Sequence, residues 1–360
     1  MSTASFGTLL TTALAARAAL HDARHETALR LFNGFTEGSP GLAIDLYART
    51  LVLHNHADPP GAARALLAEA QAVVLRELPW VRTIIVKPHK AATPGDRRGT
   101  IVHATPVERP KLDRHVQEHG VRYSIDLLMH QDTTLYLDTR NLRLWAKQQL
   151  AGKSALNMFA YTGSLGVAAM AGGARRVVHV DRNRAFLNIA KTSYVLNGLP
   201  VRRSDFQHGD FFTHTSRLRR AGEKFDCVFV DPPFFSATEK GTVDLASGCA
   251  KLINKVRPLV EEGGHIVSIN NALFVSGADY LATLEALCAD GHLAIETFID
   301  VPLDVSGYPH TRTGALPADP SPFNHPTKIA VLRVRPSGRP QPSASRAENP
   351  QLLADVGPAP

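Results

Sequence analysis

One stretch of sequence decides the fold class: Ala155-Leu156-Asn157-Met158-Phe159-Ala160-Tyr161-Thr162-Gly163-Ser164-Leu165-Gly166-Val167-Ala168-Ala169. Its apolar beginning predicts a buried strand, and its small-residue end predicts a helix after an aromatic-Thr-Gly turn. A helix N-terminus leaves amide N–H groups unpaired and carries a partial positive charge, which suits an anionic or strongly polar ligand group. Gly163 and Gly166 would let such a ligand approach the backbone closely. The stretch therefore predicts a strand–turn–helix that binds a ligand.

The glycine spacing in this turn bears on the kind of ligand. A nicotinamide dinucleotide site would have G-x-G-x-x-G here, to hold a pyrophosphate. This chain offers only Gly163-x-x-Gly166, preceded by Tyr161 and Thr162. The turn therefore favours a cofactor without a pyrophosphate, although many α/β proteins use such a turn for packing alone.

Strands and helices alternate regularly after Ser154, which predicts an α/β fold with a doubly wound parallel sheet. A hairpin formed by 121–126 and 134–140 would open this main domain, which we place at 119–335. The expected strands of the sheet are 154–158, 176–180, 225–230, 264–269, 293–300 and 328–334, with a weaker one near 201–206.

The remaining segments are smaller. Residues 1–30 predict an N-terminal helical extension, and 31–118 predict a small α+β domain with a helix at about 61–77 and a strand at 83–87. The segment 336–360 is rich in Pro and Ser and cannot bury a core, so we expect it to be a disordered tail.

The composition indicates a globular protein that can bury a sizeable core, with 360 residues and 44% hydrophobic content. It has no apolar run of about 18 residues and no export signal at its start, which predicts a cytoplasmic protein without a membrane partner. The cysteines Cys227, Cys249 and Cys288 form no C-x-x-C pair, so we expect neither a disulfide framework nor a metal site.

The charge balance favours an anionic partner, with a formal net charge of +7 and a pI near 9.4. Between Arg82 and Arg114 there are eight Lys or Arg residues against three acids. This segment is either a solvated loop or a surface that contacts phosphates.

Acidic residues end two of the expected strands, at the edge where a doubly wound sheet binds its ligand. Asp181 ends strand 176–180 about 20 residues after the turn, where it could accept hydrogen bonds from ribose hydroxyls. Asp210 follows the weaker strand and could accept from an adenine amino group. Either residue could instead cap the next helix, and the two roles can coexist.

The most specific motif is Asp231-Pro232-Pro233-Phe234-Phe235, directly after a core strand. The two prolines hold the chain rigid and remove two N–H donors. A flat base could stack on Phe234 while Asp231 accepts a hydrogen bond from its amine or ring N–H. Asn270 and Asn271, after the next strand, could read a base edge without adding charge. A local turn is the alternative in both places.

Taken together, these motifs resemble the bacterial large-subunit ribosomal RNA methyltransferases of the class I S-adenosylmethionine-dependent family. The likeness covers roughly 31–335 and is nearer to the guanine-N7 branch than to the cytosine-C5 branch. It implies a seven-stranded methyltransferase sheet beside a small α+β domain, S-adenosylmethionine as cofactor and ribosomal RNA as partner. The further motifs that carry it are Tyr136-Leu137-Asp138-Thr139-Arg140-Asn141, Asn197-Gly198-Leu199, Asn33-Gly34, Gly38-Ser39-Pro40-Gly41-Leu42 and Asp45.

The resemblance also implies roles for single residues. The cofactor would be contacted through its methionine moiety and its ribose and adenine, by Asn157, Phe159, Tyr161, Thr162, Gly163, Asp181, Arg182, Asp210 and Asp231, with Arg140 at its carboxylate. The catalytic element would be Asp231, Pro232, Pro233 and Phe234, and the target base would be bound by Phe234, Phe235, Asn270 and Asn271.

Two departures from the family pattern matter. The cytosine branch carries an RNA-binding module before its middle domain, whereas only about 30 residues precede that domain here, so we expect the small domain and the sheet rim to hold RNA. That branch also carries Thr-Cys-Ser-Cys where this chain has Ser268-Ile269-Asn270-Asn271. Methylation at cytosine C5 needs a thiolate that adds to the ring first.

A ring nitrogen already has a lone pair, so positioning alone is sufficient there. We therefore expect methylation of an RNA base at a ring nitrogen without a covalent intermediate. The alternatives are cytosine-C5 methylation through a cysteine, a dinucleotide-binding oxidoreductase, or an RNA-binding protein without catalysis. The sequence does not predict the oligomeric state or the exact nucleotide.

Overall fold

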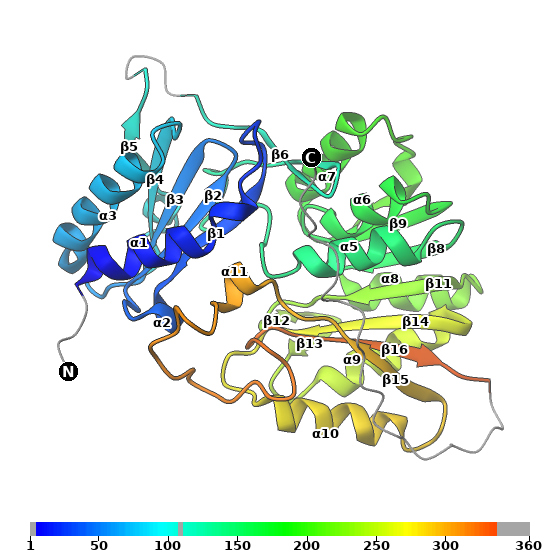
Figure 1. Ribbon diagram of the computed structural model, residues 1–360. Helices are drawn as coiled ribbons and strands as arrows, with labels where there is room; N and C mark the ends of the chain where they lie inside the picture. Colours follow the sequence, from blue (N-terminus) through cyan, green and yellow to red (C-terminus); the bar gives the residue numbers. More distant parts are fainter. Residues whose placement is uncertain (1–4, 107–110, 337–360) are drawn as a thin grey trace, which may run out of the picture.

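The computed structural model describes residues 5–106 and 111–336, which form a small unit and a main unit side by side (Figure 1). The small unit contains a five-stranded sheet in the order β1-β2-β3-β4-β5. Its strands are β1 (Ala28–Asn33), β2 (Leu42–Tyr47), β3 (Thr50–Asn55), β4 (Thr83–Pro88) and β5 (Thr100–Ala104). Neighbours are antiparallel except β3 and β4, which are parallel. A parallel pair needs a crossover, and η2 (Pro60–Ala63) and α3 (Arg64–Glu77) supply it.

The N-terminal helix belongs to the core of this small unit. Helix α1 (Phe6–Ala16) packs on α3, and its buried Leu10 lies in one apolar cluster with Leu31 and Val74. The boundary that the sequence suggested at residue 30 therefore falls inside β1. The unit also contains the short elements η1 (Ala18–Leu20), α2 (Gly34–Glu37) and α4 (Pro94–Arg97).

The hairpin between the units differs from the one expected. Strand β7 (Val121–Ser124) pairs with β6 (His115–Glu118), and not with 134–140, which contains no strand. His119 and Gly120 both have positive φ, of 50° and 77°, as a two-residue hairpin turn requires. The pairing prediction was wrong because this His-Gly turn signal was overlooked.

The main unit is built on a seven-stranded sheet in the order β10-β9-β8-β11-β14-β16-β15. All neighbouring strands from β10 to β14 are parallel, whereas β16 runs antiparallel to both its neighbours. The chain starts at the central β8 and winds outward in both directions, so the strand order reverses between β8 and β11. The strands are β8 (Ser154–Met158), β9 (Arg176–Asp181), β10 (Phe206–His208), β11 (Phe225–Val230), β14 (Val260–Asn270), β15 (Leu293–Phe298) and β16 (Lys328–Val334).

Helices cover both faces of this sheet, as the sequence predicted. One core cluster joins the sheet to α5 (Arg140–Gln149), α6 (Ser164–Ala171) and α7 (Arg184–Leu196). The other joins it to α8 (Phe211–Arg220), α9 (Cys249–Val256) and α10 (Gly277–Cys288). Alternate residues of a strand enter different clusters, with Ala155 in the first and Leu156 in the second, because successive side chains point to opposite faces.

Some details of the main unit were not foreseen. The weak strand expected at 201–206 is η3 (Arg203–Asp205) followed by β10. A hairpin of β12 (Phe235–Thr238) and β13 (Gly241–Asp244) follows β11, and η4 (Arg257–Leu259) and α11 (Leu303–Ser306) complete the unit. The tail expected to be disordered lies outside the described residues from 337 onward.

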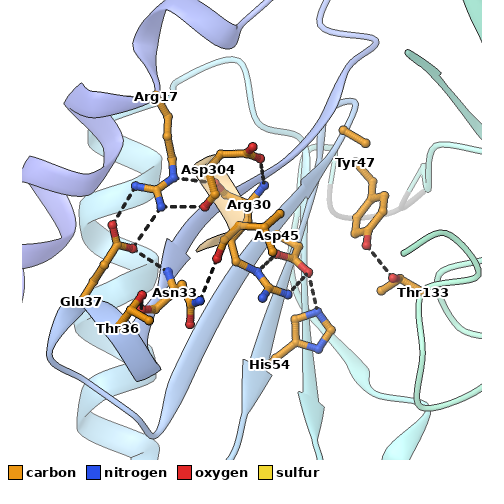
Figure 2. Close-up of polar contacts among 12 residues, drawn as sticks. Arg17, Arg30, Asn33, Thr36, Glu37, Asp45, Tyr47, His54, Thr133 and Asp304 are labelled. Carbon is orange, nitrogen blue, oxygen red and sulfur yellow. Dashed lines mark hydrogen bonds and ion pairs between the residues drawn. The ribbon is translucent and has the colours of Figure 1, made fainter. Parts of the chain in front are cut away.

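A buried ion-pair network joins the two units (Figure 2). Asp304, on α11 of the main unit, accepts a hydrogen bond from the Arg30 N–H at 3.0 Å and also binds the Arg140 guanidinium. Its carbonyl oxygen accepts from Nη2 of Arg17 at 2.7 Å, and fully buried Arg17 pairs with Glu37 at 3.0 Å. These contacts fix the orientation of the small unit against the sheet.

None of the helices in the described part of the chain has the length and apolar character that crossing a bilayer requires.

Candidate active site

A cavity of about 390 Å³ lies at the carboxyl ends of β8, β9 and β11, where the strand order reverses. Open α/β sheets bind their ligands at this position, and the volume lies within the usual range of ligand pockets. The cavity brings together residues from four of the sequence motifs, namely Asn157, Phe159, Tyr161, Asp181, Arg182, Asp231, Pro232, Pro233 and Asn271.

The turn after β8 is held in an unusual conformation. Phe159 and Tyr161 have positive φ, of 56° and 51°, which is uncommon for residues other than glycine and occurs often at functional sites. Thr162 is buried, and its Oγ1 donates to the carbonyl of Thr134 at 2.6 Å. Thr162 and Gly163 therefore support the turn from behind, while Phe159 and Tyr161 face the cavity.

The two glycines of the turn serve packing, which corrects the expectation that they let a ligand approach. A Cβ on Gly166 would overlap the His179 ring, and one on Gly163 would lie 2.7 Å from Cβ of Ala190. Helix α6 can therefore lie against β9 and α7 only with glycine at both positions.

Asp181 is fixed by backbone donors on both of its oxygens. Its Oδ2 accepts from the Tyr161 N–H and its Oδ1 from the Asn183 N–H, each at 2.8 Å. Asn183, and not Asp181, caps α7 through a bond from the Ala185 N–H. Burial raises the pKa of Asp181. Each carboxylate oxygen keeps further lone-pair capacity toward the cavity, which suits hydroxyl donors.

Aromatic rings form much of the cavity wall, and three of them were not predicted as site residues. Phe159 stacks on Phe211 with ring centroids 5.0 Å apart. The centroid of the Tyr161 ring lies 4.4 Å from that of Phe186 and 5.2 Å from that of Tyr136. Such a wall suits a flat ring system. Only Tyr136 had a sequence signal, since it belongs to a motif that carried the family resemblance.

A pair of carboxylates, Asp231 and Asp138, also lines the cavity. Burial, together with the nearby Asp138 carboxylate, raises the pKa of Asp231 to about 7. Oδ2 of Asp138 accepts from Oγ1 of Thr327 at 2.8 Å. Because two like charges are held close together, this part of the cavity favours a ligand with positive charge.

Besides Thr162 and Gly163, four further predicted site residues lie near the cavity but do not line it. Asp210 caps α8, accepting from the Thr213 N–H at 2.9 Å, in a separate hollow beside Gly209. Asn270 is buried at the end of β14, where its Oδ1 accepts from the Ala272 N–H. Phe234 and Phe235 project into solvent next to Pro233, with 52% and 61% of their surface exposed.

Arg140 lies elsewhere. Its guanidinium binds the Asp304 carboxylate and the carbonyl of Ala28, at the junction of the two units. A guanidinium engaged there is not available to a ligand carboxylate in the cavity, so this arrangement argues against Arg140 as a cofactor ligand.

At least one positive charge of the basic segment is buried. Lys87, part of the basic excess, is buried and donates to the carbonyls of His130 at 2.6 Å and Arg98 at 2.9 Å, so it cannot contact phosphates. Arg109 lies outside the described residues. The described part of the chain contains no group of His, Cys, Asp or Glu that could hold a metal ion.

Comparison with known proteins relates this site to a family. The sequence model of S-adenosylmethionine-dependent methyltransferases matches residues 102–304. The chain is 29% identical over 290 residues to "Ribosomal RNA large subunit methyltransferase I" of Photobacterium profundum, covering 79% of this chain and 72% of that protein. It is 31% identical to the Aeromonas salmonicida protein of the same name, covering 67% of this chain and 60% of the relative.

A second kind of relative has a longer chain. "Ribosomal RNA large subunit methyltransferase K/L" of Shewanella amazonensis is 31% identical over 71% of this chain, but the match spans only 35% of that protein. Among solved structures, SMU.776, a proposed methyltransferase in complex with SAH, superimposes with a TM-score of 0.76 at 21% identity, covering 92% of this chain and 83% of that one. An S-adenosylmethionine-dependent methyltransferase of Agrobacterium tumefaciens gives a TM-score of 0.56 at 18% identity, covering 88% and 92%.

Proposed function

The chain belongs to the S-adenosylmethionine-dependent methyltransferase family, and from that premise we propose that it methylates a base of large-subunit ribosomal RNA at a ring nitrogen. The names of its relatives support ribosomal RNA as substrate. The family match supports the methyltransferase function and not the alternative of a dinucleotide-binding oxidoreductase.

The observation that carries this proposal is the single cavity shared by Asp181 and Asp231. The residues present fit S-adenosylmethionine, which supplies an activated methyl group on a positively charged sulfur. Asp181 would bind ribose hydroxyls, and the stacked rings of Phe159 and Phe211 would offer a flat base an aromatic surface. Asp231 and Asp138 would favour the positive charge.

An unpartnered polar atom also supports a bound polar group in this cavity. Oδ1 of Asn271 is buried and has no hydrogen-bond partner among the residues that the structure describes, although Asn271 lines the cavity. A buried acceptor without a partner costs roughly 1–3 kcal/mol, a cost that a ligand N–H donor would remove.

The choice of a ring nitrogen rests on the cysteines. Cys227 and Cys249 are both buried and outside the cavity lining, and burial raises the pKa of both thiols. Cys288 lies on α10, also outside the lining. A C5 methylation needs a reactive thiolate at the base, and the cavity offers none. Positioning of an existing lone pair is sufficient at a ring nitrogen.

The acceptor base would be held by the residues after β11. With a pKa of about 7, Asp231 can either donate or accept a hydrogen bond near neutral pH. Phe234 and Phe235 stand exposed next to it and offer rings on which an unstacked base can lie. We therefore keep Asp231, Pro232, Pro233 and Phe234 as the proposed catalytic element.

Transfer of a labelled methyl group tests this proposal. Purified chain would be incubated with labelled S-adenosylmethionine and large-subunit ribosomal RNA from cells that lack the gene, and the modified nucleoside would be identified by mass spectrometry. We expect one methylated base with the label on a ring nitrogen. The double variant Cys227→Ala/Cys249→Ala should keep this activity. If the unchanged chain places the label on cytosine C5 and the double variant transfers none, the cytosine-C5 alternative is favoured.

A further inference from the structure

A second cavity, of about 810 Å³, lies between the two units. It meets the first cavity at Tyr136 and Asp138, which line both. The two cavities are therefore neighbours in the structure. The small unit contributes Asn33, Phe35, His54, His56 and His89 to its wall, and the main unit contributes Phe274.

Four rings of the small unit form a platform in this cavity, which we call the histidine platform: Phe35, His54, His56 and His89. His56 stacks on His89 with centroids 4.2 Å apart and planes 22° apart. Phe35 meets His56 edge-on at 4.9 Å. Strands β3 and β4 pair in parallel, with His54 opposite Lys87. His56 and His89 follow the ends of these two strands, so the pairing places them side by side.

Three close polar contacts hold the platform. Nε2 of Gln131 lies 2.7 Å from Nδ1 of His89, Nε2 of His89 lies 3.0 Å from Nδ1 of His54, and Nε2 of His54 lies 3.2 Å from Oδ2 of Asp45. Figure 2 shows the last of these contacts. If Gln131 donates to Nδ1 of His89, then Nε2 of His89 carries the proton and donates to Nδ1 of His54, so both ring nitrogens of His89 are used. The contact of His54 with Asp45 has the distance of an ion pair but not the geometry of a hydrogen bond.

Two of the platform imidazoles, His56 and His89, are uncharged near neutral pH. Burial and the neighbouring His54 lower the pKa of His56 to about 4 and that of His89 to about 3, and the positive charges of Arg30 and Lys90 act in the same direction on His56. The Asp45 carboxylate is occupied by Arg30, at 2.7 Å, and by His54. The platform itself thus offers flat rings and no free carboxylate, and the Asp132 and Asp138 carboxylates that also line the cavity can accept from the N–H groups of a stacked base.

One polar atom at the wall is left without a partner. Oδ1 of Asn33 is buried and accepts no hydrogen bond from any described residue, whereas its Nδ2 donates to the carbonyl of Val305 at 2.8 Å. Asn33 itself is 4% exposed and lines the cavity. An N–H donor on a ligand edge would satisfy this acceptor.

We propose that the second cavity is a nucleobase subsite, in which an unpaired base beside the methylated nucleotide stacks on the histidine platform and donates to Asn33. This inference rests on the proposed function, since it assigns the RNA substrate a second point of contact. Stacking on aromatic side chains is how single-stranded RNA is commonly held. The subsite would select RNA in which the target and a neighbouring base are both unstacked.

The test separates stacking from cofactor binding. Methyl-transfer kinetics on large-subunit ribosomal RNA would be compared for the unchanged chain, His56→Ala and His56→Phe. Because loss of one stacked base contact weakens single-strand binding by roughly tenfold, we expect His56→Ala to raise KM for RNA by about that factor. His56→Phe keeps a flat ring and should stay within about threefold. The dissociation constant of S-adenosylmethionine, measured by calorimetry, should not change in either variant.

His292→Ala is the matched control, because His292 follows α10 in the main unit and lines neither cavity. An unchanged KM for His56→Ala would overturn the inference while leaving the methyltransferase intact. If the unchanged chain methylates no RNA, the proposed function fails instead. Binding of a labelled single-stranded RNA of about 12 nucleotides then decides: weaker binding by His56→Ala supports the subsite, and equal binding rejects it.

Discussion

Ionisation of Asp231 should control how tightly the cofactor binds. Burial and Asp138 raise the pKa of Asp231 to about 7, so this carboxyl is about one tenth ionised at pH 6 and about nine tenths at pH 8. A positively charged sulfonium binds better beside a carboxylate than beside a carboxylic acid. The affinity for S-adenosylmethionine should therefore rise with pH, by up to about tenfold between pH 6 and 8, and level off above.

The assay is calorimetric titration at pH 6, 7 and 8 with the unchanged chain and two variants. Asp231→Asn removes the titrating group. The difference in pH dependence between this variant and the unchanged chain therefore separates Asp231 from the ligand's own groups and from Asp181 in the same cavity. Asp138→Asn removes the like charge and lowers the pKa of Asp231. The increase in affinity for S-adenosylmethionine should therefore occur at lower pH. Identical pH profiles for the unchanged chain and Asp231→Asn would refute the reasoning.

Three further predictions concern binding and stability. Asp181→Ala should weaken S-adenosylmethionine binding by at least about tenfold, as loss of a charge-assisted hydrogen bond costs roughly 1.5–3 kcal/mol; calorimetry with unchanged affinity would contradict the ribose assignment. Arg17→Ala leaves a buried partner charge and should lower the free energy of unfolding by about 3–5 kcal/mol, whereas Arg76→Ala, in an exposed pair, should change it by less than about 1 kcal/mol. Gly166→Ala forces a Cβ into an occupied space and should cost about 1–3 kcal/mol, whereas Gly61→Ala, with open space around it, should cost less in the same denaturant titration.

The parts of the site that the sequence predicted are those encoded by local patterns. Asp181 and Asp231 each follow an apolar run that forms a parallel strand, and the carboxyl ends of such strands meet at one edge of the sheet. The turn after β8 was predictable because an apolar run is followed directly by an aromatic-Thr-Gly sequence. The doubly wound fold followed from the regular alternation of strands and helices.

The remaining parts depend on contacts between distant residues. Tyr136 and Asp138 reach the cavity because their loop is tied to the turn by the bond from Thr162 to Thr134, a contact that no sequence spacing reveals. Arg140 is turned to Asp304, which lies 164 residues further along the chain, and no sequence spacing reveals that pairing.

The histidine platform also depends on residues that are distant in the sequence. His54 and His89 are 35 residues apart, and only the crossover through α3 brings β3 and β4 into parallel pairing. Gly166 shows that a local pattern can have a second cause. It belongs to a pattern typical of ligand-binding turns, but the structure needs glycine there so that helix α6 can pack against His179.

The most direct test of the central claim is a mass-spectrometric inventory of methylated nucleosides in large-subunit ribosomal RNA from cells with and without the gene. The account predicts that one ring-nitrogen methylated base disappears without the gene, returns with the unchanged chain, and does not return with Asp181→Ala. An identical inventory in all of these cells would contradict the account.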